Sequence, residues 1–192
     1  MERLKALLTA YAPCDAQEAS DREMMLEAIE RMPGILTREN RFAHFTASSW
    51  IVNPARTKVL MAFHNIYKSW AWTGGHADGD ADLLAVALRE AREETGVERI
   101  APVSTDIYSV EIVPVNWHIK RGAFVSSHLH MNVSFLLTAD DGQPLRAKPD
   151  ENSAVAWMPL EEAADNKEEP IMKLVYEKLN RKLERYRQTC ES

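Results

Sequence analysis

One stretch of the sequence, residues 73–97, limits the possible folds more than any other. It reads TGGHADGDADLLAVALREAREETGV, so a glycine pair and a loop of short acidic residues precede a helical pattern over 82–95. Gly96 follows at the position where glycine commonly ends a helix. At 3.6 residues per turn, one side of this helix is expected to face a core. That side carries Leu84, Ala87, Leu88, Ala91 and Thr95.

Three glutamates crowd the edge of this predicted helix. Glu90 and Glu94 are four residues apart and Glu93 is three residues from Glu90, so their carboxylates are expected to converge within one turn. Like charges at this spacing destabilise an isolated helix by roughly 0.2–0.5 kcal/mol per pair. A hard divalent cation would offset the repulsion, because Mg²⁺ prefers oxygen ligands. Arg89, four residues before Glu93, is expected to pair with it.

The loop before the helix helps to distinguish a cation site from a helix face that is simply exposed to solvent. Helices rich in glutamate and arginine are commonly plain solvent-facing surfaces. Here, however, a glycine pair precedes the helix, and Asp78, Asp80 and Asp82 crowd its start. At least one of these aspartates is expected to act only as an N-cap. The combination favours a cation site over a solvated face.

The segment from Gly75 to Val97 resembles the Nudix box, G-x5-E-x7-R-E-U-x-E-E-x-G-U, where U is bulky and aliphatic. Two positions depart from that pattern. Ala81 stands where the first glutamate is expected, with Asp80 as a candidate replacement, and Ala91 is small for the aliphatic position. The positions that match in register are Gly75, Arg89, Glu90, Glu93, Glu94, Gly96 and Val97.

The resemblance implies an α+β fold, a Nudix-type α/β/α sandwich with a mixed β-sheet. It also implies hydrolysis of a diphosphate, usually in a nucleoside diphosphate derivative, with Mg²⁺ or Mn²⁺ as cofactor. Carried onto this chain, it makes Glu90, Glu93 and Glu94 the metal ligands or their immediate partners. Arg89 would orient a glutamate, and Glu93 would also serve catalysis.

The general base varies in such enzymes, and a later loop offers a candidate. Glu151 precedes a predicted strand at 155–158, although a solvated loop acid is an equally good interpretation. Gly74 and Gly75 are expected to bind substrate or metal through backbone groups. His76 follows them directly and is expected to contact a substrate phosphate.

A second histidine pattern lies further along the chain. His128 and His130 alternate within a predicted strand, so both are expected to point to one face. Such a pair can bind a transition metal. A hydrogen-bonded pair on a polar sheet face is the favoured interpretation, and contact with a substrate is a third.

Hydrophobic periodicity predicts the remaining elements, and the resemblance to the Nudix box implies two regions. An N-terminal helical extension at 1–36 precedes a Nudix hydrolase domain at 37–192, which includes a C-terminal amphipathic helix. The apolar stripe of that last helix is expected to pack on the domain, with a homodimer contact as the alternative. It consists of Ile171, Leu174, Val175, Leu179, Leu183 and Tyr186. Helices are predicted at 2–11, 16–32, 159–166 and 168–187, and strands at 42–53, 58–63, 69–73, 107–118, 124–138 and 155–158.

Charge and composition limit the partners. The formal charge of −6 leaves no basic surplus, so neither a nucleic-acid polymer nor a membrane surface is an expected partner. No apolar run approaches the ~18 residues of a transmembrane helix, and no secretory signal pattern is visible. Cys14 and Cys190 read as thiols of a reducing cytosol. Taken with the activity that the resemblance implies, these limits predict a cytoplasmic enzyme that acts on a small diphosphate.

Two other functions remain as alternatives. A non-catalytic nucleotide-binding regulatory module would share the fold, but such modules usually lose the box glutamates that are intact here. An isopentenyl diphosphate isomerase would need a cysteine near the active site. Both cysteines of this chain lie near its termini.

Overall fold

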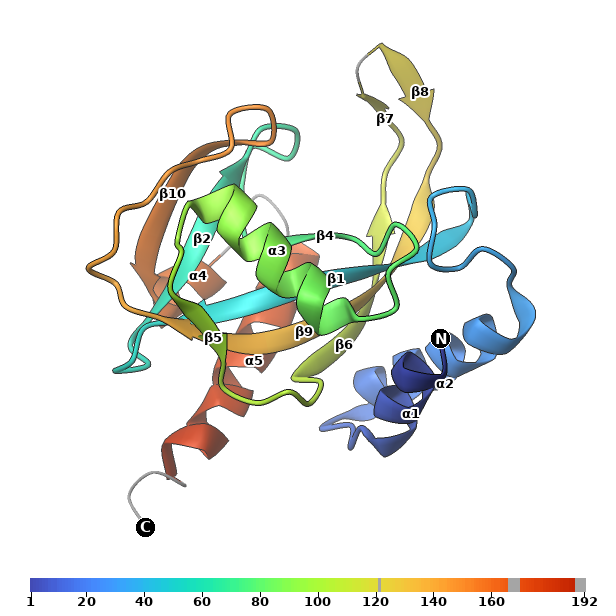
Figure 1. The fold of residues 1–192 in the computed structure, drawn as a ribbon, viewed down its shortest axis with the longest axis horizontal. Coiled ribbons are helices and arrows are strands. Elements are labelled where there is room, and N and C mark those ends of the chain that lie inside the picture. The colour runs from blue at the N-terminus through green and yellow to red at the C-terminus, as the bar shows by residue number, and fades with distance from the viewer. Residues whose placement is uncertain (121, 166–169, 189–192) are drawn as a thin grey trace. The chain divides into compact units, whose positions relative to one another are not determined.

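The computed structural model describes residues 1–120, 122–165 and 170–188 (Figure 1). The chain divides into two compact units, each assembled from three separate segments. Unit 1 comprises residues 1–48, 74–87 and 105–135, and unit 2 comprises 49–73, 88–104 and 136–192. Four elements contribute residues to both units: β1 (Ala43–Val52), β4 (Thr73–His76), α3 (Leu83–Thr95) and β9 (His128–Ala139).

Unit 1 is built on the antiparallel pairing of β6 with β9. The register runs from Ser109 opposite Ser134 to Val115 opposite His128. The two long strands predicted at 107–118 and 124–138 are thus confirmed, but each is interrupted, because β7 and β8 form a separate two-stranded pair. The other elements wholly or mainly in this unit are α1 (Glu2–Ala10), α2 (Ala16–Arg31), β4 (Thr73–His76), β6 (Ser109–Val115), β7 (His118–Lys120) and β8 (Ala123–Val125).

Helices α1 and α2 confirm the two predicted N-terminal helices. The side chain of Asp15 accepts a hydrogen bond from the Glu18 backbone N–H (2.9 Å), and Glu18 Oε2 accepts one from the Cys14 N–H (2.8 Å). The first contact is an N-cap, which explains where α2 begins, and the second ties Glu18 to the residue before the cap. In α2, Met25 is fully buried, whereas Met24 is 47% exposed.

Polar contacts fix α2 to the sheet of unit 1. The Ser109 hydroxyl donates to the buried carboxylate of Glu18 (2.8 Å), and the Ile112 backbone N–H donates to Asp21 (2.8 Å). A buried carboxylate without such donors would be strongly destabilising. The N-terminal helices are therefore packed parts of unit 1.

Unit 2 contains strands in the order β10-β2-β1-β9-β5, with β3 also paired to β2. The predicted hairpin at Asn53 is confirmed: Val52 lies opposite Val59, and Asn53 Oδ1 accepts hydrogen bonds from the backbone of Thr57 and Lys58. The other elements wholly in this unit are β2 (Lys58–His64), β3 (Trp70–Ala71), β5 (Ile100–Pro102), β10 (Asn152–Pro159), α4 (Leu160–Ala164) and α5 (Pro170–Gln188).

The apolar stripe predicted for the last helix is wrong at its first two positions. Ile171 and Leu174 are 57% and 67% exposed, although Val175, Leu179 and Leu183 are buried as expected. Tyr176 takes the buried position instead, stacking on the ring of Trp50 with centroids 5.2 Å apart. The start of α5 is therefore buried on the side that carries Tyr176, because this ring packs on Trp50 of the sheet. The side that carries Ile171 and Leu174 faces solvent.

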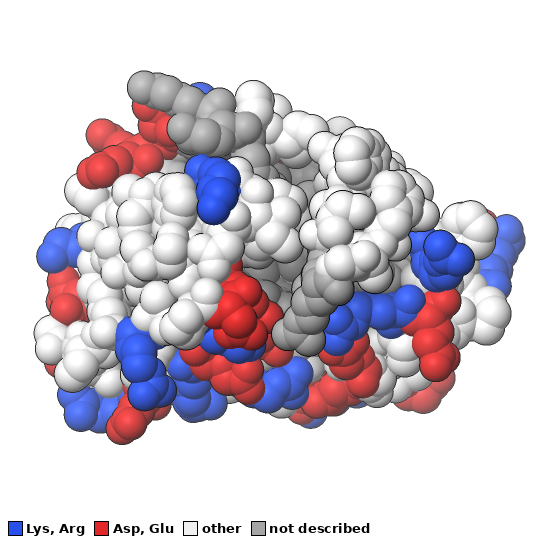
Figure 2. Space-filling view, turned by 90° about the horizontal axis from the view of Figure 1, so that it is seen from above, with Lys and Arg blue, Asp and Glu red and all other residues white. Residues whose placement is uncertain are grey.

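Charges on the face drawn in Figure 2 are mixed in sign, with acidic and basic side chains interspersed along its lower edge. This agrees with a modest net charge of −6. Among the described residues, none of the helices has the length and apolarity needed to span a membrane.

Candidate active site

The C-terminal end of α3 confirms the predicted glycine cap, and two features explain why glycine is required there. Gly96 has a φ of +72°, and its N–H donates to the Arg92 carbonyl (2.9 Å). A Cβ added at Gly96 would lie 2.8 Å from the Cβ of Arg146. The Arg146 N–H in turn donates to the Thr95 carbonyl (2.8 Å). Glycine therefore lets the loop after β9 approach the end of the helix.

The buried side of α3 agrees only in part with the predicted one, since Ala87, Ala91 and Thr95 are buried as expected. Leu84 and Leu88 are half-buried, whereas Glu94 is 5% exposed and belongs to the buried side. The neighbouring Glu93 is exposed. Consecutive residues on a helix are rotated by about 100°, so these two carboxylates point in different directions.

The pairing predicted for Arg89 is also wrong. Its guanidinium Nη2 lies 3.4 Å from Glu90 Oε1, and the cation at Glu93 is Lys148, whose Nζ lies 3.3 Å from Oε2. Lys148 reaches Glu93 because the Gly96 contact holds its loop beside the helix. The three glutamates consequently have different partners.

Glu94 is held by a residue at the start of β10. The Nδ2 of Asn152 donates to Glu94 Oε2 (3.1 Å), and both residues are buried. The other amide atom, Asn152 Oδ1, is buried and has no hydrogen-bond partner within the described ranges. A buried carboxylate and an unsatisfied amide oxygen therefore lie side by side.

Lys148 brings together two residues that are far apart in the sequence and that were predicted to act in catalysis. Its Nζ lies 3.3 Å from Glu93 and 3.0 Å from Glu151. Backbone hydrogen bonds from Glu151 (3.0 Å) and Asn152 (2.7 Å) to the Lys148 carbonyl form the turn that places these side chains. A carboxylate–ammonium–carboxylate cluster results.

Local charge and burial alter two pKa values in this cluster. Burial raises the pKa of Glu90, the charge of Glu93 adds to the effect, and Arg89 opposes it. Burial acts to lower the pKa of Lys148, but hydrogen bonds to Glu151 and Glu93 outweigh it and raise that pKa above its ordinary value. The ammonium of Lys148 therefore stays charged at neutral pH.

The donor set can be compared with what Mg²⁺ requires. Glu90, Glu93, Glu94 and Asn152 offer carboxylate and amide oxygens, which are the ligands this hard cation prefers. The unsatisfied Asn152 Oδ1 is an oxygen of that kind. In the described part of the chain, the three glutamates do not form a group whose ligand atoms all lie within 4.8 Å of one another. The expected convergence is thus looser than predicted, while the donor chemistry fits.

The predicted substrate-binding residues Gly74, Gly75 and His76 lie in β4, in unit 1. A Cβ at Gly74 would lie 2.5 Å from the Ala47 carbonyl oxygen, so glycine is needed for the close packing of β4 on β1. This packing requirement is separate from any contact with substrate.

The aspartates before α3 have local structural partners. Asp82 accepts a hydrogen bond from the Ala85 N–H (3.2 Å), which confirms the predicted N-cap. Asp80 accepts one from the Asp82 N–H (2.9 Å), beside Ala81. Asp78 forms a two-pronged ion pair with Arg38, at 2.8 and 2.5 Å.

The alternating histidines form the hydrogen-bonded pair that the sequence favoured. His128 Nε2 lies 3.2 Å from His130 Nε2. His76 and His44 lie beside them, with ring centroids 5.0 Å apart. Burial lowers the pKa of His44, and burial together with the neighbouring imidazoles lowers that of His130 to about 2.

Three residues of these clusters were not predicted from the sequence: Lys148, Asn152 and His44. Lys148 stands three positions before Glu151, and that spacing was a usable signal. Asn152 and His44 carried none, because each lies in a strand and contacts residues that are remote in the chain.

Comparison with known proteins identifies the fold. The model of the NUDIX domain family matches residues 43–179. Among solved structures, a C. elegans Ap4A hydrolase binary complex is 16% identical, with a TM-score of 0.52 over 76% of this chain and 98% of its own. A Nudix hydrolase from M. smegmatis, RenU, is 16% identical, with a TM-score of 0.53 over 72% and 84%.

A third solved structure has a similar fold. The MutT protein from Methanosarcina mazei Go1 is 17% identical, with a TM-score of 0.53 over 71% of this chain and 92% of its own. No curated protein matches the chain. The structural likeness at this low identity concerns the fold, and it confirms the α+β class with a mixed sheet.

Proposed function

Because the chain belongs to the NUDIX domain family, we propose that this Nudix-type hydrolase cleaves a diphosphate linkage by attack of water on phosphorus. The substrate class is a nucleoside diphosphate derivative or a similar small molecule, and the cofactor is Mg²⁺ or Mn²⁺. One observation carries the proposal: Lys148 brings Glu151 beside Glu93, 3.0 and 3.3 Å from its Nζ, at the acidic end of α3.

The metal ligands in this proposal are Glu90, Glu93 and Glu94. Glu94 is the most constrained of them, because it is buried and accepts a hydrogen bond from Asn152. When bound, the divalent cation supplies Lewis-acid stabilisation of the charge that develops on the phosphoryl oxygens. Arg89 orients Glu90, which it contacts directly.

Glu151 is the proposed general base. Its carboxylate is 38% exposed, so water can reach it, and its ion pair with Lys148 holds it in position. A carboxylate can take the proton from the attacking water. Lys148 adds a permanent positive charge that favours an anionic substrate nearby.

The backbone of Gly74 and Gly75 and the ring of His76 are proposed to contact the substrate. Support for this comes from the Nudix box register, which begins at Gly75. The Ap4A hydrolase among the structural neighbours is a reason to include Ap4A among the compounds tried.

The proposal also covers the setting of the enzyme. We propose a cytoplasmic setting, in keeping with two cysteines that are expected to be free thiols. Light scattering after size exclusion separates a monomer from the homodimer that the last helix suggested.

A panel of diphosphate compounds tests the proposed activity. With Mg²⁺, the protein is expected to release phosphate or a nucleoside monophosphate from at least one compound, and a chelator should abolish the release. No turnover across a broad panel with either Mg²⁺ or Mn²⁺ would overturn the enzyme proposal. Binding of a nucleotide without turnover would support the regulatory-module alternative.

A further inference from the structure

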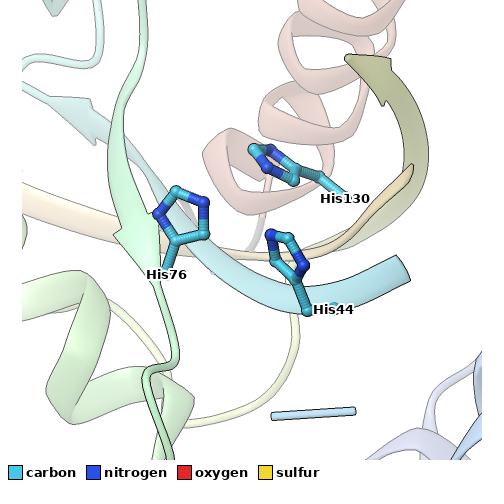
Figure 3. A group of neighbouring side chains, drawn as sticks. All are labelled: His44, His76 and His130. Atoms are coloured by element: carbon cyan, nitrogen blue, oxygen red, sulfur yellow. The ribbon is translucent and has the colours of Figure 1, made fainter. Parts of the chain in front are cut away.

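Three imidazole rings from three strands face one another in unit 1 (Figure 3). They belong to His44 of β1, His76 of β4 and His130 of β9. One ring nitrogen from each lies within 4.8 Å of those of the other two. Ring centroids are 4.9–5.1 Å apart. Nitrogen ligands of a tetrahedral zinc ion lie about 3.4 Å apart, given Zn–N bonds of about 2.0–2.1 Å. Small side-chain rotations would therefore bring these nitrogens onto one ion.

The hydrogen bonding of His44 leaves one nitrogen available. Its Nδ1 lies 3.1 Å from the backbone carbonyl of Asn40, and a carbonyl can only accept. Nδ1 therefore carries the proton, and Nε2 carries the lone pair. Histidines that bind metals are commonly oriented by this N–H···O=C contact.

The available nitrogen of His44 is also buried. The residue is 4% exposed, and Nε2 has no hydrogen-bond partner in the described part of the chain. Buried polar atoms are nearly always satisfied, so an orphaned one requires an explanation. A hydrogen-bonded histidine network accounts for His128 and His130. It leaves His44 Nε2 unexplained.

The chemistry of the donors selects the class of ion. The group consists of imidazoles alone, which suit borderline transition ions such as Zn²⁺ and do not suit Mg²⁺. Three protein ligands leave a fourth position for water or for a further ligand. His128 lies next to His130 and can support it or fill that position.

We propose that His44, His76 and His130 form a binding site for a divalent transition metal ion, with Zn²⁺ as the preferred ion. The site does not rest on the proposed hydrolase activity, because its donors are imidazole nitrogens and none of the box glutamates takes part. It gives a role to His44 and His130, which the proposed diphosphate chemistry leaves unused.

Metal titration of the full-length, metal-stripped protein tests this site. Excess Mg²⁺ is kept in solution so that carboxylate sites are filled by a hard cation. Zn²⁺ binding is measured by equilibrium dialysis, and Co²⁺ binding by the visible absorption of its low-symmetry nitrogen complexes. We expect one Zn²⁺ per chain bound at this site, and a Co²⁺ spectrum typical of mixed nitrogen and oxygen coordination.

The variants leave His76 untouched, since it is also an expected substrate contact. His44→Gln and His130→Gln should each weaken Zn²⁺ binding by roughly 100-fold or more, because even outer-shell changes cost about 10–100-fold. His118→Gln, in β7, is the matched control and should bind as the wild type does. Circular dichroism of each metal-free variant verifies its fold, and if His44→Gln fails to fold, His130→Gln decides. Equal Zn²⁺ affinity in the wild type and the folded ligand variants would overturn the proposal.

Discussion

Glu94 shows how one side chain can differ from its neighbours on the same helix. It is 5% exposed and accepts a hydrogen bond from Asn152, whereas Glu93 is exposed and pairs with Lys148. A buried carboxylate is costly unless it is hydrogen-bonded or binds a cation. Glu94 is therefore the glutamate whose geometry is most tightly defined.

Glu94→Gln should lower kcat by about 100-fold or more, since it removes a negative charge from the proposed metal site. The fold should survive, because glutamine has the same shape and its amide oxygen can still accept from Asn152. Steady-state kinetics with Mg²⁺ on an active panel compound measures the effect.

Glu98→Gln is the control for that substitution. Glu98 follows the end of α3 and is exposed, so its variant should keep the wild-type kcat. A near-wild-type kcat in Glu94→Gln would remove Glu94 from the proposed metal site.

At the scale of elements, the contact between the end of α3 and the loop after β9 positions the cluster of Glu93, Lys148 and Glu151. Gly96 ends the helix in a left-handed conformation and lies against Arg146. That approach brings Lys148 and Glu151 to the acidic end of α3. The cluster is thus a product of one helix terminus and one loop.

Gly96→Ala should destabilise the protein more than Gly122→Ala. Both glycines have positive φ, +72° and +80°, so both variants strain the backbone. The Cβ at Gly96 would also lie 2.8 Å from Arg146 Cβ, whereas none of the described atoms lies within 4 Å at Gly122. Overpacking of this kind adds about 1–3 kcal/mol.

Urea unfolding of the two alanine variants measures that difference in the free energy of unfolding. Equal losses would mean that the loop at Arg146 moves away without cost. In that case the contact between Gly96 and Arg146 would not hold Lys148 in place.

At the scale of the molecule, the N-terminal helices raise the question of where the folded domain begins. We proposed a helical extension at 1–36 and a hydrolase domain at 37–192, and the family model matches 43–179. In unit 1, however, α2 accepts hydrogen bonds from Ser109 and Ile112 of β6 and donates one to the Val110 carbonyl. The extension should therefore contribute to the stability of that unit.

Leu8→Ala should lower the free energy of unfolding by about 2–5 kcal/mol, because Leu8 is fully buried in α1. Leu7→Ala is the control, since Leu7 is half-buried and should cost less. Hydrogen exchange of the β6 amides should accelerate in Leu8→Ala if the helices stabilise unit 1. Unchanged exchange in β6 would show that residues 1–36 fold as an appended element.

Local features of the fold could be predicted from the sequence because they depend on neighbouring residues. The span of α3, its Gly96 cap, the Asp82 N-cap and the hairpin at Asn53 each follow from helical period or turn chemistry. The matching register of the box likewise identified the family that the NUDIX model supports. The buried face of α5 depends on the part of the sheet that it packs against, so its prediction from helical period was only partly correct.

By itself, the sequence determined which residue types could take part in the chemistry and the local element that holds each of them. The tertiary structure alone decided their partners: Lys148 at Glu93, Asn152 at Glu94, and His44 among the histidines. The physical reason is that these contacts join segments that are far apart in the chain. Packing of loops and strands sets such contacts, and periodicity along one helix cannot reveal them.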